Sequence, residues 1–416
     1  AGAIFFHISN TLNGSLDHVT NMKTVHDDGV MGLDNFSIKN LEIFRSLSTQ
    51  GSHGTLIDLL DHTIPNGGGR LLKQWLSRPL NNIHRLNNRI DTVDAFRNHK
   101  NQLKIGFGSC LKQNKPMPIF ESIKSENLDL FLMIGDNVYG DSKTEDLKEL
   151  KLAYKRQKQN FNKMELDFPF EAIWDDHDYG LNDAGKEYLF KEGSKALFLD
   201  FWDISLNDPR RFREGLYHDV SMTFEGKKIQ IIFLDTRTFR DNLKPSDDRG
   251  APGKERYIPY EDSSLTILGA EQWEWLRKKI SEPTEYRIIA SSIQFIPVGH
   301  GWECWNNLPY ERNRLINLIN SSNMKHTLVI SGDRHRGGLY QLKTDQGNII
   351  SEMTSSSLNA SFPNAEEAGP LRIGDTIIQE NYGSIYLDGG IKSILTVMLK
   401  NIDGKILQSL QINNNK

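Results

Sequence analysis

The stretch that most constrains the fold is a continuous apolar run that leads into turn residues and polar groups. Residues 130–141 read LFLMIGDNVYGD, so the run from Leu130 to Ile134 is followed at once by Gly135 and Asp136. An unbroken run of this kind is typical of a strand that is buried on both faces, as in a parallel or mixed sheet. In open α/β sheets, ligands bind beyond the carboxyl ends of the strands. The stretch therefore predicts a buried strand that delivers Asp136 and Tyr139 to a binding or catalytic site, with a plain surface turn as the alternative.

Length and composition exclude several classes of protein. The 416 residues are enough for two or three domains with separate cores. The net charge of −4 provides no general basic field for nucleic acid or an anionic membrane. Two cysteines, Cys110 and Cys304, are too few for a disulfide framework. Because no window approaches the roughly 18 apolar residues of a transmembrane helix, we expect no membrane partner. An anionic substrate would need local metal ions or arginines.

The first hundred residues carry helical patterns but no cluster of chemically reactive side chains. Apolar residues recur at helical spacing over residues 41–47, 54–60, 70–76 and 83–96, and the segment Pro65–Gly69 is expected to interrupt them. The polar segment Arg97–Leu103 is a natural boundary. We therefore predict two domains, residues 1–100 and residues 101–416.

The second domain alternates predicted strands and helices and then becomes rich in strands. Strands are predicted at 105–107, 128–134, 170–174, 228–234, 287–296, 327–330, 338–342, 349–354, 383–387, 394–399 and 406–412. Helices are predicted at 117–125, 144–165, 268–280 and 309–321. This order predicts an α/β fold, a two-sheet sandwich with helices outside and the active site across the strand ends, preceded by a small, mainly helical segment.

Several predicted strands end in groups that bind metal ions or phosphate. They are Cys110, Asp136 with Tyr139, Asp175 with Asp176 and His177, Arg237, and Asp333 with His335. Crowded carboxylates repel one another, which raises their pKa values unless a cation neutralises them. A single Asp bridging two metal ions is typical of binuclear phosphoester hydrolysis. Thiolate and phenolate ligands indicate Fe(III) at one position, and carboxylates and amides indicate Ca²⁺, Mg²⁺ or Mn²⁺ at the other.

The same residues carry a resemblance to a known family. The motifs are GSC at 108–110, GDNVYGD at 135–141, WDDHDYGLNDAG at 174–185, LDTRTFR at 234–240, LGAEQWEWL at 268–276 and SGDRHRG at 331–337. Together, over about residues 104–399, they resemble the PhoD-like alkaline phosphatases of the metallophosphoesterase superfamily. The resemblance implies an α/β/β/α sandwich and hydrolysis of phosphoesters.

The resemblance also implies roles for individual residues. Cys110 stands where the wider superfamily has its first ligands, Asp136 matches the bridging carboxylate, and Tyr139 matches an iron-binding phenolate. Asp176 matches an Asn ligand of the wider superfamily, and His177 matches a histidine that protonates the leaving group. Asp333 and His335 match the last pair of ligands. The resemblance thus implies that the metal ligands lie at the carboxyl ends of several predicted strands.

Some assignments remain open between alternatives. Asp175 or Asn182 could serve as a ligand in place of Asp176. Arg237, Arg334 and Arg336 are candidates to hold phosphate by bidentate contacts, with ion pairing as the alternative. Preference for monoesters or for diesters is also open.

The N-terminal segment resembles a different family. Over residues 31–96, the runs LDNFSIKNLEIFRSL, GSHGTLIDLLDHT, GGGRLLKQWLSRPLNN and RIDTVDAF look like the start of the core (lever) domain of MutS mismatch-repair proteins. In that family the region is a helical scaffold between a DNA clamp and an ATPase. The sequence has no GxxxxGK[ST] phosphate loop. We therefore interpret residues 1–100 as a MutS-like remnant fused to another protein, through natural fusion or an error of gene assembly.

The sequence as a whole predicts a metal-dependent hydrolase of small phosphoesters with Fe(III) plus Ca²⁺, Mg²⁺ or Mn²⁺. One rival is a repair scaffold that binds DNA through the N-terminal segment. The other rival is a catalytically inactive binding domain. The cellular location is left open, since no signal peptide is recognisable after Ala1, whereas PhoD-like proteins are commonly exported.

Overall fold

The structure is a computed structural model that describes residues 29–63, 66–90, 102–322, 324–362, 369–389 and 393–413. The chain divides into two compact units, Ala1–His99 and Lys100–Lys416. The assignment of these units as a MutS-like fragment and a phosphatase domain stays a prediction. Within the described residues, no helix combines the length and the apolar character needed to cross a bilayer.

The first unit is a small helical segment, as the sequence predicted. Its helices are α2 (Asn35–Asn40), α3 (Leu56–Leu60) and α4 (Asn66–Ser77), and residues 83–90 are also helical. The remainder of the helix predicted over 83–96, and most of the predicted boundary at 97–103, lie outside the described residues.

Two details of the first unit differ from the sequence-based predictions. The helix predicted over 41–47 lies earlier, because the side chain of Asp34 caps α2 at Ser37 N (2.7 Å) and Glu42 takes a positive φ of 46°. The glycine-rich segment does not interrupt a helix, since α4 begins at Asn66. Among the described residues of this unit, Ile43 and Ile57 are the buried hydrophobic side chains, whereas Phe36 is 76% exposed. This segment buries little apolar surface of its own.

The second unit is a sandwich of two mixed sheets, which confirms the predicted fold class. In the described part of the chain the first sheet has the strand order β13-β12-β11-β1-β2-β3, and the second has the order β10-β8-β9-β7-β6-β5-β4. The strands of the first sheet are β1 (Gln102–Gly108), β2 (Leu130–Ile134), β3 (Phe170–Ile173), β11 (Asn381–Asp388), β12 (Leu395–Asn401) and β13 (Ile406–Ile412). The strands of the second are β4 (His218–Phe224), β5 (Lys227–Leu234), β6 (Tyr286–Ser291), β7 (His326–Ser331), β8 (Gly337–Lys343), β9 (Ile349–Ser355) and β10 (Arg372–Ile377).

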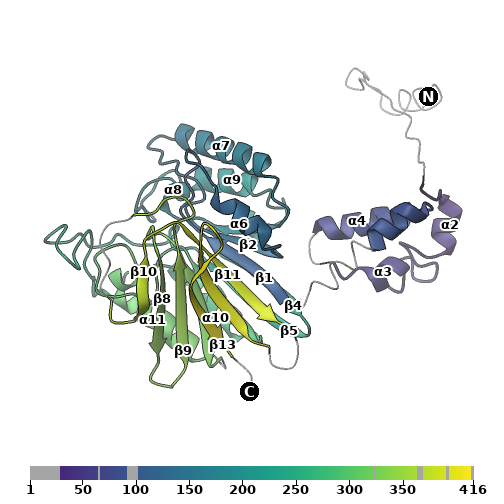
Figure 1. The fold of residues 1–416 in the computed structure, drawn as a ribbon. Helices are drawn as coiled ribbons and strands as arrows, with labels where there is room; N and C mark the ends of the chain where they lie inside the picture. Colours follow the sequence, from purple (N-terminus) through teal and green to yellow (C-terminus); the bar gives the residue numbers. More distant parts are fainter. Residues whose placement is uncertain are drawn as a thin grey trace. The chain divides into compact units, whose positions relative to one another are not determined.

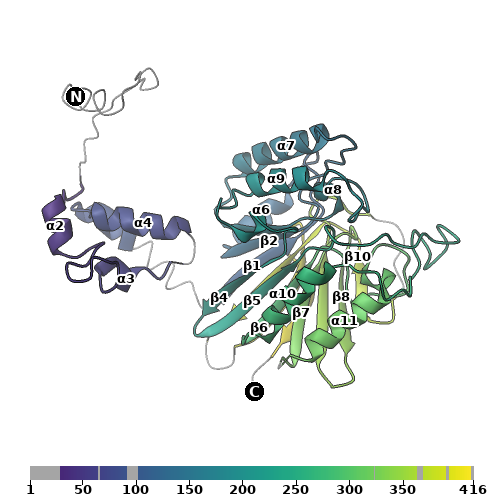
Figure 2. The ribbon, with the colours of Figure 1, turned by 180° about the vertical axis from the view of Figure 1, so that it is seen from behind.

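Helices cover the outer faces of the sandwich (Figures 1 and 2). Helices α6 (Ile119–Ser125), α7 (Lys148–Met164) and α9 (Lys191–Phe201) lie beside the first sheet, and the short α8 (Asp176–Tyr179) follows β3. Helices α10 (Gly269–Ser281) and α11 (Pro309–Asn320) lie on the second sheet, where Trp273, Leu276 and Leu315 pack into one buried cluster with Ile232 and Ile289. Short 3-10 helices occupy Pro209–Arg211 and Trp305–Asn307. Helices α8 and α9 and strands β4 and β10 were not predicted from the sequence.

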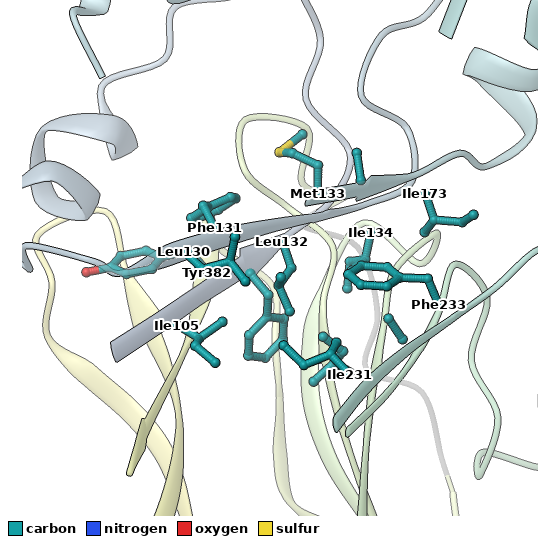
Figure 3. Packing of buried hydrophobic residues seen from close by; sticks show 14 of the residues in the cluster. Ile105, Leu130, Phe131, Leu132, Met133, Ile134, Ile173, Ile231, Phe233 and Tyr382 are labelled. Carbon is teal, nitrogen blue, oxygen red and sulfur yellow. The ribbon is translucent and has the colours of Figure 1, made fainter. Parts of the chain in front are cut away.

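Strand β2 is buried on both faces, as its unbroken apolar run predicted. All five of its residues are buried. Because side chains alternate along a strand, Leu132 and Ile134 point toward Ile231 and Phe233 of the facing sheet (Figure 3). Phe131 points to the other side, where its ring lies 6.1 Å from that of Phe120 in α6. The strand thus joins the core between the sheets to the layer of helices.

Glycines let the ends of the two sheets approach each other closely. A Cβ on Gly332, just after β7, would lie 2.5 Å from Ser109 Oγ and 2.9 Å from the carbonyl oxygen of Ser292. Gly135, just after β2, has a φ of 105°, and its Cβ would lie 3.0 Å from that of Ser292, which follows β6 of the second sheet. A side chain at either position would push apart the loops that follow the strands of the two sheets. These positions bring the strand ends of the two sheets together.

A buried carboxylate fastens α6 to the first sheet. Glu126 at the end of α6 accepts hydrogen bonds from Ser384 (2.8 Å) and Tyr386 (2.6 Å), and also from Tyr382. Lys400 Nζ lies 2.8 Å from its Oε1, and both side chains are 8% exposed. Burial raises the pKa of Glu126, but the Lys400 and tyrosine contacts lower it more, so the net shift is downward. The cluster is therefore most stabilising when Glu126 is ionised.

Replacing Glu126 with Gln should destabilise the second unit by about 3 kcal/mol at neutral pH, because the Lys400 charge would stay buried without a counter-charge. The native pKa is lowered, so this contribution is fully present above pH about 4.5 and is lost as the pH falls further. Urea denaturation at pH 7 and pH 4 measures the difference, which should shrink at the lower pH. The double variant E126Q/K400M should recover part of the loss. Equal stability of E126Q and the unaltered protein at pH 7 would contradict this role of Glu126.

Candidate metal centre

Strand ends from both sheets meet at one edge of the sandwich. Strands β1, β2 and β3 are parallel neighbours, and so are β5, β6 and β7. Their carboxyl ends therefore lie at the same edge of each sheet. Cys110, Asp136 and Asp176 follow the strands of the first sheet, and Asp333 follows β7 of the second. The fold thus brings together residues that lie far apart in the sequence.

The backbone turns sharply at four of these residues. Cys110, Asp136, Asp333 and His335 have φ values of 60°, 51°, 68° and 54°. Residues other than glycine seldom adopt positive φ, and such conformations concentrate at functional sites. The chain thus accepts local strain where it presents the predicted ligands.

Asp136 lies at the centre of the site. Its Oδ2 lies 3.5 Å from Cys110 Sγ and accepts a hydrogen bond from Tyr139 Oη at 2.9 Å. Tyr139 Oη also lies 3.3 Å from His335 Nε2. Cys110, Asp136 and His335 each offer a ligand atom within 4.8 Å of the others. Among the described residues no donor reaches Asp136 Oδ1, although that atom is buried. The site therefore contains an acceptor with no protein partner, as a metal position requires.

A second group of carboxylates lies beside the first. Asp136, Asp176 and His177 form one set of ligand atoms within 4.8 Å of one another, and Asp175, Asp176 and Asp333 form another. Asp176 accepts backbone hydrogen bonds from His177 (2.9 Å) and Asp183 (2.7 Å), which fix its orientation. Asp136 and Asp176 are thus each shared between adjoining candidate metal-binding groups.

The electrostatics of the site suit bound cations. Burial raises the pKa of Cys110 well above its usual range, and Asp136 raises it further. Burial also raises the pKa of Asp136, with repulsion from Asp176, and that of Asp333, with repulsion from Asp175. The deprotonated forms of these groups, which are the forms that bind metals, need positive charge nearby. Thiolate, phenolate, imidazole and carboxylate donors together fit a transition metal beside a hard divalent cation.

Two histidines are held in defined orientations. Nδ1 of His335 contacts the carbonyl oxygen of Ala360, so Nδ1 carries the proton and Nε2 keeps its lone pair for a ligand. Burial lowers the pKa of His335 to about 4, which favours this neutral form. Nδ1 of His177 lies 2.7 Å from Asp141 Oδ2. Burial lowers the pKa of His177, but Asp176 and Asp136 raise it to about 11. These contacts make His177 a candidate proton donor and His335 a candidate ligand.

Most predicted site residues line one cavity of about 230 Å³. They are Asp136, Tyr139, Asp176, His177, Asn182, Asp333, Arg334 and His335. Cys110 is fully buried beneath Asp136. Arg336 is buried but does not line the cavity. Asp176 and Asn182 line the cavity and Asp175 does not. Asp175 nevertheless belongs to one candidate metal-binding group with Asp176 and Asp333, so the choice among these ligands stays a prediction.

Arg237 does not occupy the position expected of a phosphate-binding residue. It is fully buried and absent from the cavity wall. Its Nε donates to Asp175 Oδ1 at 2.6 Å, and its Nη1 donates to both oxygens of Glu303 at 2.9 Å. Ser292 Oγ donates to the same Asp175 oxygen at 2.7 Å. The guanidinium of Arg237 therefore lies outside the cavity wall, where it pairs with the carboxylates of Asp175 and Glu303.

Six other residues of the cavity wall were not predicted from the sequence. They are Lys112, Asp183, Arg256, Trp302, Glu303 and Phe362. Trp302 and Glu303 follow β6 in the Gly-rich stretch 299–303, and Arg256 lies in the long loop 241–259. A loop of that length in a compact domain is commonly functional, and this signal could have drawn attention to Arg256. These six residues add two cations, two carboxylates and two aromatic rings to the cavity wall.

Comparison with known families agrees with this arrangement of strand ends and ligand types. The sequence pattern of the family described as "PhoD-like phosphatase" matches residues 105–386. The chain belongs to the PhoD-like phosphatase family. This membership confirms the resemblance seen in the motifs and implies a phosphoester substrate.

Individual relatives match parts of this chain. Alkaline phosphatase D of Bacillus subtilis (strain 168) is 23% identical over 325 residues, which cover 67% of this chain and 54% of that protein. A solved structure titled "Structure of PhoD" has a TM-score of 0.57 and 20% identity and covers 75% of this chain and 68% of that one. The latter likeness shows the fold alone.

The resemblance to MutS is also confirmed, as a partial similarity. The DNA mismatch repair protein MutS of Syntrophobacter fumaroxidans is 44% identical over 93 residues, which cover 22% of this chain and 10% of that protein. MutS of Flavobacterium psychrophilum is 34% identical over 104 residues, which cover 25% of this chain and 12% of that protein. The chain thus spans about a tenth of these repair proteins and about half of alkaline phosphatase D.

Replacing Arg237 with Met should destabilise the second unit by about 3 to 5 kcal/mol, because buried Asp175 would lose its cation and buried Glu303 would keep only Arg240, whose Nε lies 3.1 Å from Glu303 Oε1. Denaturation by urea measures the loss. Arg277→Met is the matched control, since Arg277 forms an exposed pair with Glu274 and its removal should cost less than about 1 kcal/mol. R237M/D175N should regain stability relative to R237M, because it removes the carboxylate charge left without a cation and leaves the pair of Arg240 with Glu303 intact. If R237M were as stable as R277M, the buried ion pairs would not have the role described.

Proposed function

We propose that the protein hydrolyses phosphate monoesters, diesters or both at a binuclear metal site, with Fe(III) in one position and Ca²⁺, Mg²⁺ or Mn²⁺ in the other. Cys110, Tyr139 and His335 would hold the iron together with Asp136. Asp176, Asn182 and Asp333 would hold the divalent ion, with Asp136 shared between the two. This assignment follows from the donor types, because thiolate and phenolate suit the transition metal and carboxylate and amide oxygens suit the hard cation.

The observation that carries this proposal is the position of Asp136. Its carboxylate belongs to the group with Cys110 and His335 and also to the group with Asp176 and His177. Its buried Oδ1 has no hydrogen-bond donor among the described residues. When bound, such a metal pair lowers the pKa of a water molecule and neutralises phosphoryl oxygens.

The side chains around the metal positions would complete the chemistry. His177 lines the cavity, and Asp141 contacts its Nδ1, so Nε2 can give a proton to the leaving oxygen of the ester. Arg334 lines the cavity and would bind the phosphoryl group by charge-assisted hydrogen bonds. Arg237 would act as a positioning residue that keeps Asp175 fixed behind the ligands. Arg336 is not part of the cavity wall and would have a structural role next to Arg334 and His335.

The repair-scaffold alternative rests on the MutS similarity, which spans about a tenth of those proteins. We therefore retain hydrolysis as the proposal.

Purified protein should contain iron and a divalent ion and should hydrolyse p-nitrophenyl phosphate, with activity lost on chelation and restored by the metals. Replacing Tyr139 with Phe should abolish the visible absorption band of the phenolate-to-iron transition, because the phenolic oxygen is removed. Metal analysis and absorption spectroscopy measure both effects.

Tyr154→Phe is the control for this spectrum. Tyr154 is also a buried tyrosine, but it lies in α7 and outside the cavity wall. Its replacement should leave the band and the iron content unchanged. Protein without bound metal and without activity would support the inactive-domain alternative, and a band that persists in Y139F would contradict the assignment of iron to Tyr139.

A further inference from the structure

The long loop 241–259 is fastened to the cavity by its backbone. The amides of Arg256 and Tyr257 both donate to the carbonyl oxygen of Gly301, at 2.9 Å and 2.7 Å, and Gly301 N donates to Glu255 Oε2 at 2.5 Å. Within the loop, Ser246 N donates to the carbonyl oxygen of Arg256 at 2.8 Å. These hydrogen bonds therefore hold the loop segment at Arg256 against residues 299–303.

The side chain of Arg256 is also held in place. Its Nη1 lies 2.7 Å from Asp183 Oδ2, and its guanidinium carbon lies 5.1 Å from the centre of the Trp302 ring. The side chain of Arg256 is 32% exposed and that of Asp183 is 14% exposed. Among the described residues, its side-chain hydrogen bond uses Nη1, which leaves Nε and Nη2 for a ligand in the cavity that Arg256 lines.

The location of Arg256 relative to the candidate ligands suits contact with a substrate. Asp183, its partner, offers an oxygen within 4.8 Å of ligand atoms of Asp176 and Glu303. Arg334 lines the same cavity, and its guanidinium carbon lies 5.0 Å from the same Trp302 ring. Trp302 thus lies beside the guanidinium groups of Arg256 and Arg334, in the cavity that the candidate metal ligands also line. A rigid guanidinium fork at such a place matches the geometry of phosphoryl oxygens.

We propose that Arg256 binds the non-reacting oxygens of the substrate's phosphoryl group and thereby favours phosphate monoesters over diesters. This inference rests on the proposed hydrolysis. A monoester phosphoryl group is a dianion at neutral pH with three unsubstituted oxygens, whereas a diester is a monoanion with two. The additional charge and the additional oxygen give a fixed guanidinium more to bind in the monoester. Arg256 takes the role that the sequence motifs suggested for Arg237.

The test compares three variants of the full-length, metal-loaded protein. Replacing Arg256 with Ala should raise the KM for p-nitrophenyl phosphate about tenfold to a hundredfold, as expected for the loss of a charge-assisted hydrogen bond. The inhibition constant of inorganic phosphate should rise by a similar factor. The KM for bis(p-nitrophenyl) phosphate should rise by less than about threefold, since a monoanion gains less from the lost charge.

Tyr257→Phe separates substrate binding from support of Asp183. Tyr257 Oη donates to the same Asp183 oxygen as Arg256, at 2.8 Å, but Tyr257 does not line the cavity. Y257F should keep the KM and the phosphate inhibition constant of the unaltered protein. Arg249→Ala removes a charge from an exposed part of the same loop and should also have no effect.

An unchanged KM in R256A, or equal losses for the monoester and the diester, would overturn the role of Arg256. Equal effects of R256A and Y257F would show that Arg256 acts through Asp183 alone and would also overturn it. Absence of hydrolysis by the metal-loaded unaltered protein is a different result, because it would remove the proposed function itself. Metal content is measured for every variant, and R256A should retain the metal content of the unaltered protein.

Discussion

The cost of burying several carboxylates at one place is the constraint on which the rest of the structure depends. Asp136, Asp175 and Asp176 are buried, and the partly exposed Asp333 offers a ligand atom within 4.8 Å of those of Asp175 and Asp176. Like charges in a poorly solvated site repel strongly. Arg237 supplies permanent positive charge to Asp175 from behind. We infer that bound metal ions supply the rest. This arrangement explains why Asp175 is paired with Arg237 outside the cavity wall, whereas Asp136, Asp176 and Asp333 line the cavity.

The sandwich makes this concentration of charge possible because its strands direct their carboxyl ends to one edge. Strand β2, packed between the facing sheet and α6, provides a rigid base for Asp136. Gly332 permits the close approach of the two sheets. The left-handed backbone at Asp136 and Asp333 then turns their side chains at the end of each strand. Asp136 is only 1% exposed, so the packing around it can hold this conformation in place.

The parts of the fold that could be predicted from sequence are those with a strong local pattern. The apolar run of β2 identified both the strand and its polar end, and the two-sheet class followed from the order of such strands. By contrast, β4 is an edge strand whose residues are mostly partly exposed, and β10 has three exposed residues, so neither has an apolar run. The role of Arg237 depends on Glu303, 66 residues away, and a motif alone gives no information about that pairing. The position of Arg256 could not be predicted from the sequence either, because it depends on backbone hydrogen bonds between two loops.

The most direct test of the binuclear site is a crystal structure of the metal-loaded protein with anomalous diffraction collected on both sides of the iron absorption edge. We expect an iron peak bounded by Cys110 Sγ, the Asp136 carboxylate, Tyr139 Oη and His335 Nε2. A second ion, without iron's anomalous signal, should share Asp136 and contact Asp176 and Asp333. An iron peak away from Asp136, or no ion between these strand ends in active protein, would contradict the proposed site.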